Sequence, residues 1–114
     1  FEYSTKVAGS KAIIVLGHTH CGAVKGAVDK ADVGQNLTTL LNAIEPAVTA
    51  TPLEGERSSR NHRFVEAVAE TNVRMAVSAM VTQSAVIKEL VDAGTVKVIG
   101  ALLDIETGMV SFLA

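Results

Sequence analysis

The sequence predicts an α/β fold, with a parallel β-sheet core flanked by helices and a C-terminal antiparallel hairpin strand. Two observations carry this prediction: short β-branched apolar runs alternate with stretches of helical periodicity, and a turn dipeptide separates the last two apolar runs. With 114 residues, 48% of them apolar and 19% charged, the chain has the size and composition of one globular domain. We therefore expect residues 1–114 to form a single domain.

The chain opens on a helical segment that leads into the first strand. Residues 1–9 are typical of the tail of a helix, with Gly9 just beyond its end. Because the first residue is Phe1 and not Met, we expect the sequence to begin in mid-structure. The run AIIVL at residues 12–16 is typical of a strand that is covered on both faces in a parallel sheet.

The middle of the chain predicts helices and one loop. Residues 21–28 are rich in small side chains and indicate a helical turn or two. Apolar residues at helical spacing then predict an amphipathic helix over residues 37–48, which Pro46 should kink or end. Residues 49–59 combine Pro and Gly with polar residues and indicate a loop, which we expect to be the most mobile segment.

The last half of the chain contains the longest helix and a hairpin. Residues 61–81 keep an apolar stripe wide enough to meet more than one partner surface. A helix over residues 84–93, with Ser84 as its cap, precedes a strand at 96–103. Thr107 and Gly108 then turn the chain into a last strand at 109–113.

Charge and composition exclude several kinds of partner. Ten Lys and Arg residues against 12 Asp and Glu residues give a net charge of −2, which leaves no electrostatic footprint for a nucleic-acid backbone or an acidic membrane. No apolar run approaches the roughly 20 residues that a membrane-spanning helix needs. We therefore expect no nucleic-acid and no membrane partner. The single cysteine cannot form an internal disulfide, so cysteine usage gives no indication of the cellular compartment.

Residues that carry chemistry concentrate directly after the first strand. The segment GHTHCG at residues 17–22 holds two of the three histidines and the only cysteine. It follows the carboxyl end of a strand, where parallel sheets bind their ligands. The H-x-x-C spacing of His18 and Cys21 can bring an imidazole nitrogen and a sulfur onto one metal ion. A helix that starts at Cys21 would favour the thiolate, which is the form that binds Zn²⁺.

Two alternatives compete with a metal site at this segment. The glycines at 17 and 22 have the G-x-x-x-x-G spacing of a phosphate-binding loop, but Ala23 and Val24 stand where that loop requires Lys and Ser or Thr. Cys21 could instead be a small buried hydrophobe, with the histidines as ordinary polar loop residues. A spacing that supplies only two ligands does not by itself decide between these alternatives.

The other histidines and carboxylates are weaker candidates. His20 could replace His18 as a ligand, but the two imidazoles should point apart on a turn between strand and helix, and the H-x-x-C spacing favours His18. His62 lies in a polar helix start, and Glu54 and Glu56 lie in the expected loop with no His or Cys beside them. We expect these three side chains to be solvated.

The segment AIIVLGHTHCGAVKGAV at residues 12–28 resembles the zinc-binding strand and turn of the β-class carbonic anhydrases. The resemblance runs on through the whole chain. Residues 1–9 are similar to the family's preceding helix, and Asn72-Val73 resembles an Asn-Val pair in its long helix. The ending is similar to the family's final helix, strand and hairpin, at Ser84 to Ile87, Gly94, Gly100-Ala101 and Asp104 to Val110.

This resemblance implies a zinc enzyme that interconverts CO₂ with bicarbonate and a proton. By match to the motif, His18 and Cys21 would be two zinc ligands, and Gly22 would lie at the substrate pocket. The family's third protein ligand is a cysteine in a Cys-x-Asp-x-Arg segment of an earlier strand, whose Asp and Arg control the fourth zinc position. This sequence contains none of that segment. The catalytic residues therefore stay unassigned, and strand 12–16 should lack a neighbour on one side.

The leading interpretation is the C-terminal portion of a β-carbonic anhydrase, a zinc lyase whose N-terminal part is absent and which we expect to be inactive in this form. One alternative is a non-catalytic, zinc-free α/β module that serves in assembly. Another is a hydrolase of a CO₂ analogue such as carbonyl sulfide. The family forms dimers or higher assemblies, and the apolar stripe over residues 61–81 is consistent with at least a homodimer.

Overall fold

The computed structural model describes residues 1–52 and 55–114. It confirms the α/β class and the order of helices and strands that the sequence predicts. In chain order the elements are α1 (Glu2–Lys6), β1 (Ala12–His18), α2 (Gly22–Val28), α3 (Gln35–Ala50), α4 (His62–Gln83), α5 (Ala85–Asp92), β2 (Lys97–Leu103) and β3 (Val110–Leu113).

The three strands form one mixed sheet in the order β1-β2-β3. β1 and β2 are parallel, and the register sets Ala12 opposite Lys97 and His18 opposite Leu103. β2 and β3 are antiparallel, which confirms the C-terminal hairpin. Within the described residues β1 pairs with β2 alone, so it is an edge strand with a free side, as the resemblance implies.

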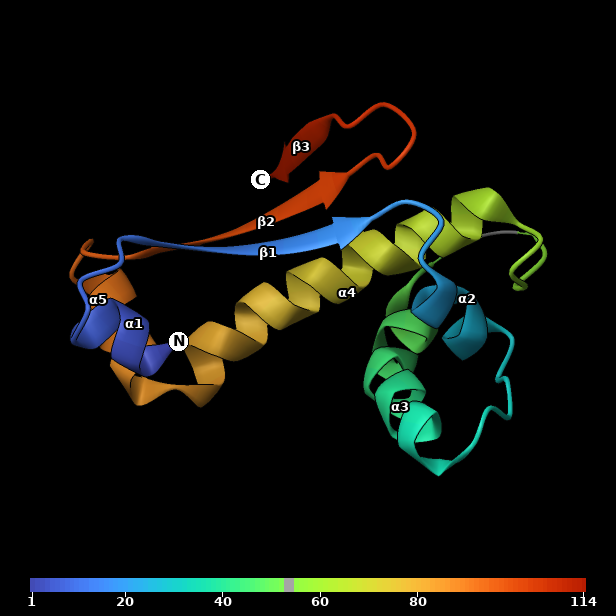
Figure 1. The fold of residues 1–114 in the computed structure, drawn as a ribbon, viewed down its shortest axis with the longest axis horizontal. Coiled ribbons are helices and arrows are strands. Elements are labelled where there is room, and N and C mark those ends of the chain that lie inside the picture. The colour runs from blue at the N-terminus through green and yellow to red at the C-terminus, as the bar shows by residue number, and fades with distance from the viewer. Residues whose placement is uncertain (53–54) are drawn as a thin grey trace.

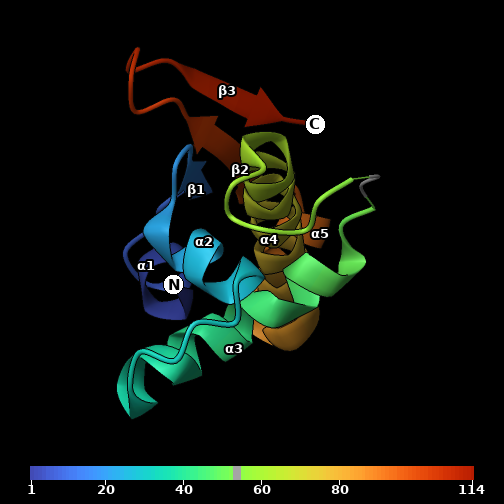
Figure 2. The same cartoon turned by 90° about the vertical axis from the view of Figure 1, so that its right-hand side faces the viewer.

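The helices lie on one side of this sheet (Figures 1 and 2). The long helix α4 packs on both β1 and β2, while α2 and α3 lie near the carboxyl end of β1 and α1 and α5 near its amino end. Contact between α4 and the sheet is close at two glycines. A Cβ atom added at Gly17 would lie 2.6 Å from Cγ2 of Val73, and one added at Gly100 would lie 2.9 Å from Cγ1 of the same residue.

The opposite face of the sheet is uncovered, so the prediction that the first strand is covered on both faces is wrong for this chain. Burial alternates along β1: Ile13 is buried against the helices, whereas Ile14 and Leu16 are 54% and 51% exposed. Phe112 of β3 is 66% exposed and lies opposite Ala101 of β2, on the same face as Leu16. The physical reason is that α4 packs on the other side of the sheet and that the remaining helices in the described part of the chain lie on that side too (Figures 1 and 2).

Two groups of buried apolar side chains hold the helices together. The larger lies between α2, α3 and α4 and centres on Phe64, Val65 and Val68 of α4. The smaller joins Ile13 of β1 to α5 and the start of β2. Arg57 lies at the edge of the larger group, with its guanidinium 4.6 Å from the Phe64 ring centroid. It donates hydrogen bonds to the carbonyl of Val48 in the last turn of α3, at 2.6 Å, and to that of the C-cap residue Thr51, at 3.1 Å.

Two helix boundaries differ from the prediction. Of the two predicted effects of Pro46, the end of the helix is wrong, because α3 continues to Ala50, while the kink stays a prediction. The missing N–H removes only the bond to the carbonyl of Asn42, an exposed residue, while the buried Ala47 and Val48 hold the last turn in place. Helix α1 ends at Lys6, before the expected Gly9, which lies beyond it with a φ of +80°.

The other boundaries follow the predicted signals. The Ser84 hydroxyl accepts a hydrogen bond from the Ile87 N–H at 3.2 Å, which confirms Ser84 as the cap of α5. The loop predicted over residues 49–59 begins after Ala50, since α3 extends to that residue. Residues 53–54 lie outside the described ranges, and so does the expected solvation of Glu54.

Helix α4 is the longest helix and has a wide apolar stripe, as predicted. It packs against α2, α3 and α5 as well as the sheet, so its own chain already covers much of the stripe that suggested a dimer. Several exposed large apolar side chains lie on the open face of the sheet, among them Ile14, Leu16 and Phe112. Neither α4 nor any other helix in the described part of the chain is long and apolar enough to cross a membrane.

We predict that Gly17→Ala destabilises the protein by about 1–3 kcal/mol, because the added methyl group would overlap the buried and stiff Val73 side chain. Urea unfolding followed by circular dichroism measures this loss. Gly22→Ala is the matched control, since a Cβ there has nothing within 4 Å and lies in the first turn of a helix. Equal stability of the two variants would contradict the close contact.

Candidate metal centre

The candidate metal ligands lie where β1 turns into α2. His18 is the last residue of β1, Cys21 is the N-cap of α2, and Gly22 is the first residue of that helix. Thr19 fixes the turn to the end of β2: its N–H donates to the carbonyl of Leu103 at 3.0 Å, and its hydroxyl accepts from the N–H of Ile105 at 3.1 Å. The turn is therefore held to the end of β2 at Thr19, which lies between His18 and Cys21.

His18 and Cys21 line one small cavity of about 180 Å³. Nδ1 of His18 lies 2.9 Å from the carbonyl oxygen of Thr19, which can only accept, so Nδ1 carries the proton. The Nε2 lone pair is then available to a metal, an arrangement common in metal-binding histidines. Eight further residues line the cavity: Val15, Leu16, Gly17, Val24, Ile44, Ala69, Asn72 and Val73.

His20 does not line this cavity and lies near Glu106 and His62. Its backbone has a φ of +56°, and its Nε2 is 3.7 Å from Oε1 of Glu106 in the turn between β2 and β3. Its ring also meets the His62 ring edge to face, with the centroids 5.7 Å apart. The Glu106 N–H, at 2.9 Å, and the Thr107 side chain hold the pKa of the Asp104 carboxyl in the same turn below its ordinary value. This polar cluster is distinct from the residues that line the 180 Å³ cavity.

The weaker candidates also have defined places. His62 is exposed, as expected, at the start of α4. Glu56 is half-exposed and pairs with Arg60 at 2.6 Å, and the hydrogen bond from Arg60 holds the pKa of the Glu56 carboxyl below its ordinary value. Gly22 adjoins Cys21 but is not among the residues that line the cavity, and the space around its Cα is open.

The donor set fits zinc in kind but is incomplete. An imidazole nitrogen and a thiol sulfur are ligands that zinc prefers, and His18 and Cys21 present both to one cavity. Within residues 1–52 and 55–114, however, no three His, Cys, Asp or Glu side chains lie close enough together to hold a metal ion. A zinc ion here would need further ligands from elsewhere.

Sequence reasoning did not assign the α4 residues of the cavity wall to the site. Ala69, Asn72 and Val73 are spaced i, i+3, i+4, and so share one face of α4. The signal in the sequence was a polar Asn in the apolar stripe of a long helix. It becomes informative only when the packing of α4 on the strand end is known.

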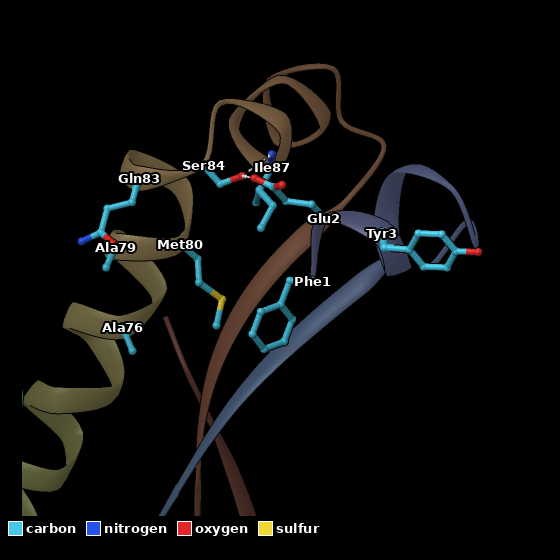
Figure 3. A pocket seen from close by; sticks show the side chains of 9 residues that line it. All are labelled: Phe1, Glu2, Tyr3, Ala76, Ala79, Met80, Gln83, Ser84 and Ile87. Carbon is cyan, nitrogen blue, oxygen red and sulfur yellow. Dashed lines mark hydrogen bonds between the residues drawn. The ribbon is translucent and has the colours of Figure 1, made fainter. Parts of the chain in front are cut away.

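A larger cavity of about 580 Å³ lies at the other end of the molecule, between α1, α4 and α5 (Figure 3). Phe1 and Met80 approach each other across it, and the Ser84 hydroxyl donates a hydrogen bond to the Glu2 carboxylate at 2.5 Å. The cavity is near the amino end of β1, and neither His18 nor Cys21 lines it. This cavity is therefore separate from the candidate metal centre.

The structure is that of an α/β protein in which His18 and Cys21 line one cavity at the carboxyl end of a parallel strand. The family model described as carbonic anhydrase matches residues 1–110, and the chain belongs to that family. It is similar to a carbonic anhydrase of Mycolicibacterium smegmatis, at 28% identity over 109 residues that cover 96% of this chain and 52% of that protein. Carbonic anhydrase 2 of Mycobacterium tuberculosis is 25% identical over 107 residues, which cover 94% and 51%.

Solved structures show the same fold. A tetrameric β-carbonic anhydrase of Sordaria macrospora matches with a TM-score of 0.81 at 22% identity, over 99% of this chain and 57% of that one. The β-carbonic anhydrase of Coccomyxa, solved in complex with acetazolamide, matches with a TM-score of 0.82 at 23% identity, over 98% and 50%. The chain thus spans about half the length of the curated relatives it matches.

Proposed function

We propose that this chain carries two of the zinc ligands of a zinc-dependent carbonic anhydrase, which in the complete protein hydrates CO₂ reversibly to bicarbonate and a proton. The observation that carries the proposal is the placement of His18 and Cys21 on one cavity at the end of β1, in a chain of this family. The cofactor is Zn²⁺, and the substrate is the small-molecule pair CO₂ and bicarbonate.

The chain's own residues would bind the metal and shape the cavity. His18 would bind through Nε2, because the Thr19 carbonyl engages Nδ1 and sets the orientation of the ring. Cys21 would bind through its sulfur. The apolar side chains of β1, α2, α3 and α4 limit water in the cavity beside these ligands, and Gly22 leaves open space next to Cys21. When bound, zinc supplies Lewis acidity that lowers the pKa of a water molecule towards about 7.

We further propose that the missing ligand comes from a Cys-x-Asp-x-Arg strand that lies beside β1. Two features support this placement. The free side of β1 offers unpaired backbone groups to another strand. The residues 15–18 that end β1 also line the cavity, so a strand added at that edge would reach it.

We predict that the chain binds Co²⁺, a spectroscopic substitute for zinc, through His18 and Cys21. Titration should produce a sulfur-to-cobalt charge-transfer band in the near ultraviolet that Cys21→Ser abolishes. His18→Ala should weaken binding at least about tenfold, because a two-ligand site loses half of its protein donors.

His20→Ala is the matched control, because His20 is adjacent in sequence but lies against Glu106 and His62. It should leave the band and the affinity unchanged. A band that persists in Cys21→Ser, or one that is lost in His20→Ala and kept in His18→Ala, would refute the ligand assignment.

We predict that the 114-residue chain with added zinc has negligible CO₂ hydration activity. Activity needs a closed ligand set and a neighbour that manages charge and proton transfer, and the described residues of this chain supply only two candidate ligands. A stopped-flow assay with a pH indicator measures the rate against a zinc-only blank. Hydration well above the blank that Cys21→Ser abolishes would show that the added strand is dispensable.

We predict at least a dimer in solution, with a second copy of the chain on the open sheet face. Ile14, Leu16 and Phe112 form an apolar patch on that face, and the exposed Lys97 lies at its edge, at the start of β2, so two copies can bury the patch against each other. Sedimentation velocity should give a dimer that Phe112→Asp dissociates, with Met75→Asp on an exposed position of α4 as control. A clean monomer at micromolar concentration would contradict this prediction.

A further inference from the structure

We propose that Asn72 binds bicarbonate in the cavity that His18 and Cys21 line, an inference that rests on the proposed function of that site. Apart from these two candidate ligands, the side chains on the cavity wall are apolar with one exception, the carboxamide of Asn72. Among the described residues of α4 that line this cavity, Asn72 is the polar one.

The packing of α4 aims this residue inward. Asn72 shares a helix face with Ala69 and Val73, which are only 5% and 3% exposed. Val73 in turn sits against the Cα of Gly17, one residue before His18. The close contact at Gly17 therefore brings the helical turn that carries Asn72 to the end of β1.

The carboxamide of Asn72 has no role in holding the described fold together. Neighbouring polar side chains are engaged: Thr71 donates to the carbonyl of Ala67 at 2.8 Å, and Arg74 pairs with Glu70 at 2.6 Å. Asn72 makes no side-chain hydrogen bond to any residue in 1–52 or 55–114, yet its polar atoms are not sealed from solvent. Since Asn is also less favourable than Ala in a helix interior, folding alone does not explain it.

The chemistry of a carboxamide matches bicarbonate better than CO₂. Its NH₂ group donates two hydrogen bonds and its oxygen accepts. Bicarbonate has oxygens that accept and an O–H that donates, so one carboxamide can satisfy both ends. CO₂ has no hydrogen to donate. An Asp at the same position would lose both donors and repel the anion.

The test is a bicarbonate titration of the zinc-loaded, ¹⁵N-labelled chain at mildly alkaline pH, followed by NMR. The side-chain NH₂ signals of Asn72, assigned from their loss in Asn72→Ala, should shift with bicarbonate only when zinc is present. Asn72→Ala should weaken bicarbonate binding by about 3- to 10-fold for each of the two hydrogen bonds that are lost. Asn72→Asp, which keeps the shape, should weaken it further. Asn42→Ala, at an exposed position of α3, should change nothing.

The outcomes separate this inference from the proposed function. Bicarbonate affinity within about twofold of the wild type in Asn72→Ala, with an unchanged circular dichroism spectrum, would overturn the role of Asn72 and leave the metal site standing. Recovery of binding in Asn72→Asp would indicate a structural role and would also overturn it. Zinc binding that does not depend on His18 and Cys21 would overturn the proposed site and this inference together.

Discussion

The seating of Val73 between Gly17 and Gly100 is the contact on which the geometry of the candidate site depends. Both glycines leave room that a Cβ atom would fill, and Val73 is a stiff β-branched residue with almost no exposed surface. Helix α4 therefore lies close to the carboxyl ends of β1 and β2. From this position Ala69 and Asn72 line the same cavity as His18 and Cys21. One packing contact therefore brings together the H-x-x-C segment and the middle of a helix that comes much later in the chain.

A second constraint is the one-sided covering of the sheet. The parallel strands β1 and β2 are joined by a crossover connection that contains α2, α3, α4 and α5, and this connection lies on one face of the sheet. The other face keeps its apolar side chains, and β1 keeps a free edge. The free edge of β1 adjoins the cavity that His18 and Cys21 line, so the strand proposed above would lie next to the candidate metal centre.

The turn between β1 and α2 contacts the turn between β2 and β3. Thr19 accepts a hydrogen bond from the Ile105 N–H, and His20 lies near Glu106, so the turn before α2 rests on the hairpin turn. The carboxylate of Asp104 accepts hydrogen bonds from the N–H groups of Glu106 and Thr107, and these bonds stabilise the hairpin turn. His18 and Cys21 are therefore presented from a braced turn and not from a free loop.

The sequence alone determined the α/β class, the order of the elements, the cap at Ser84, the terminal hairpin and the place of the H-x-x-C pair after the first strand. These follow from local signals, because periodicity, caps and turn residues act over a few neighbouring positions. Only the tertiary structure decided that one face of β1 is open, that Pro46 lies inside α3, and that Asn72 reaches the cavity of His18 and Cys21. The run AIIVL is equally compatible with one covered face or two, since burial depends on which elements the rest of the chain supplies. Likewise, the buried side chains of α3 outweigh one lost hydrogen bond, and the position of Asn72 follows from the long-range contact of α4 with two glycines.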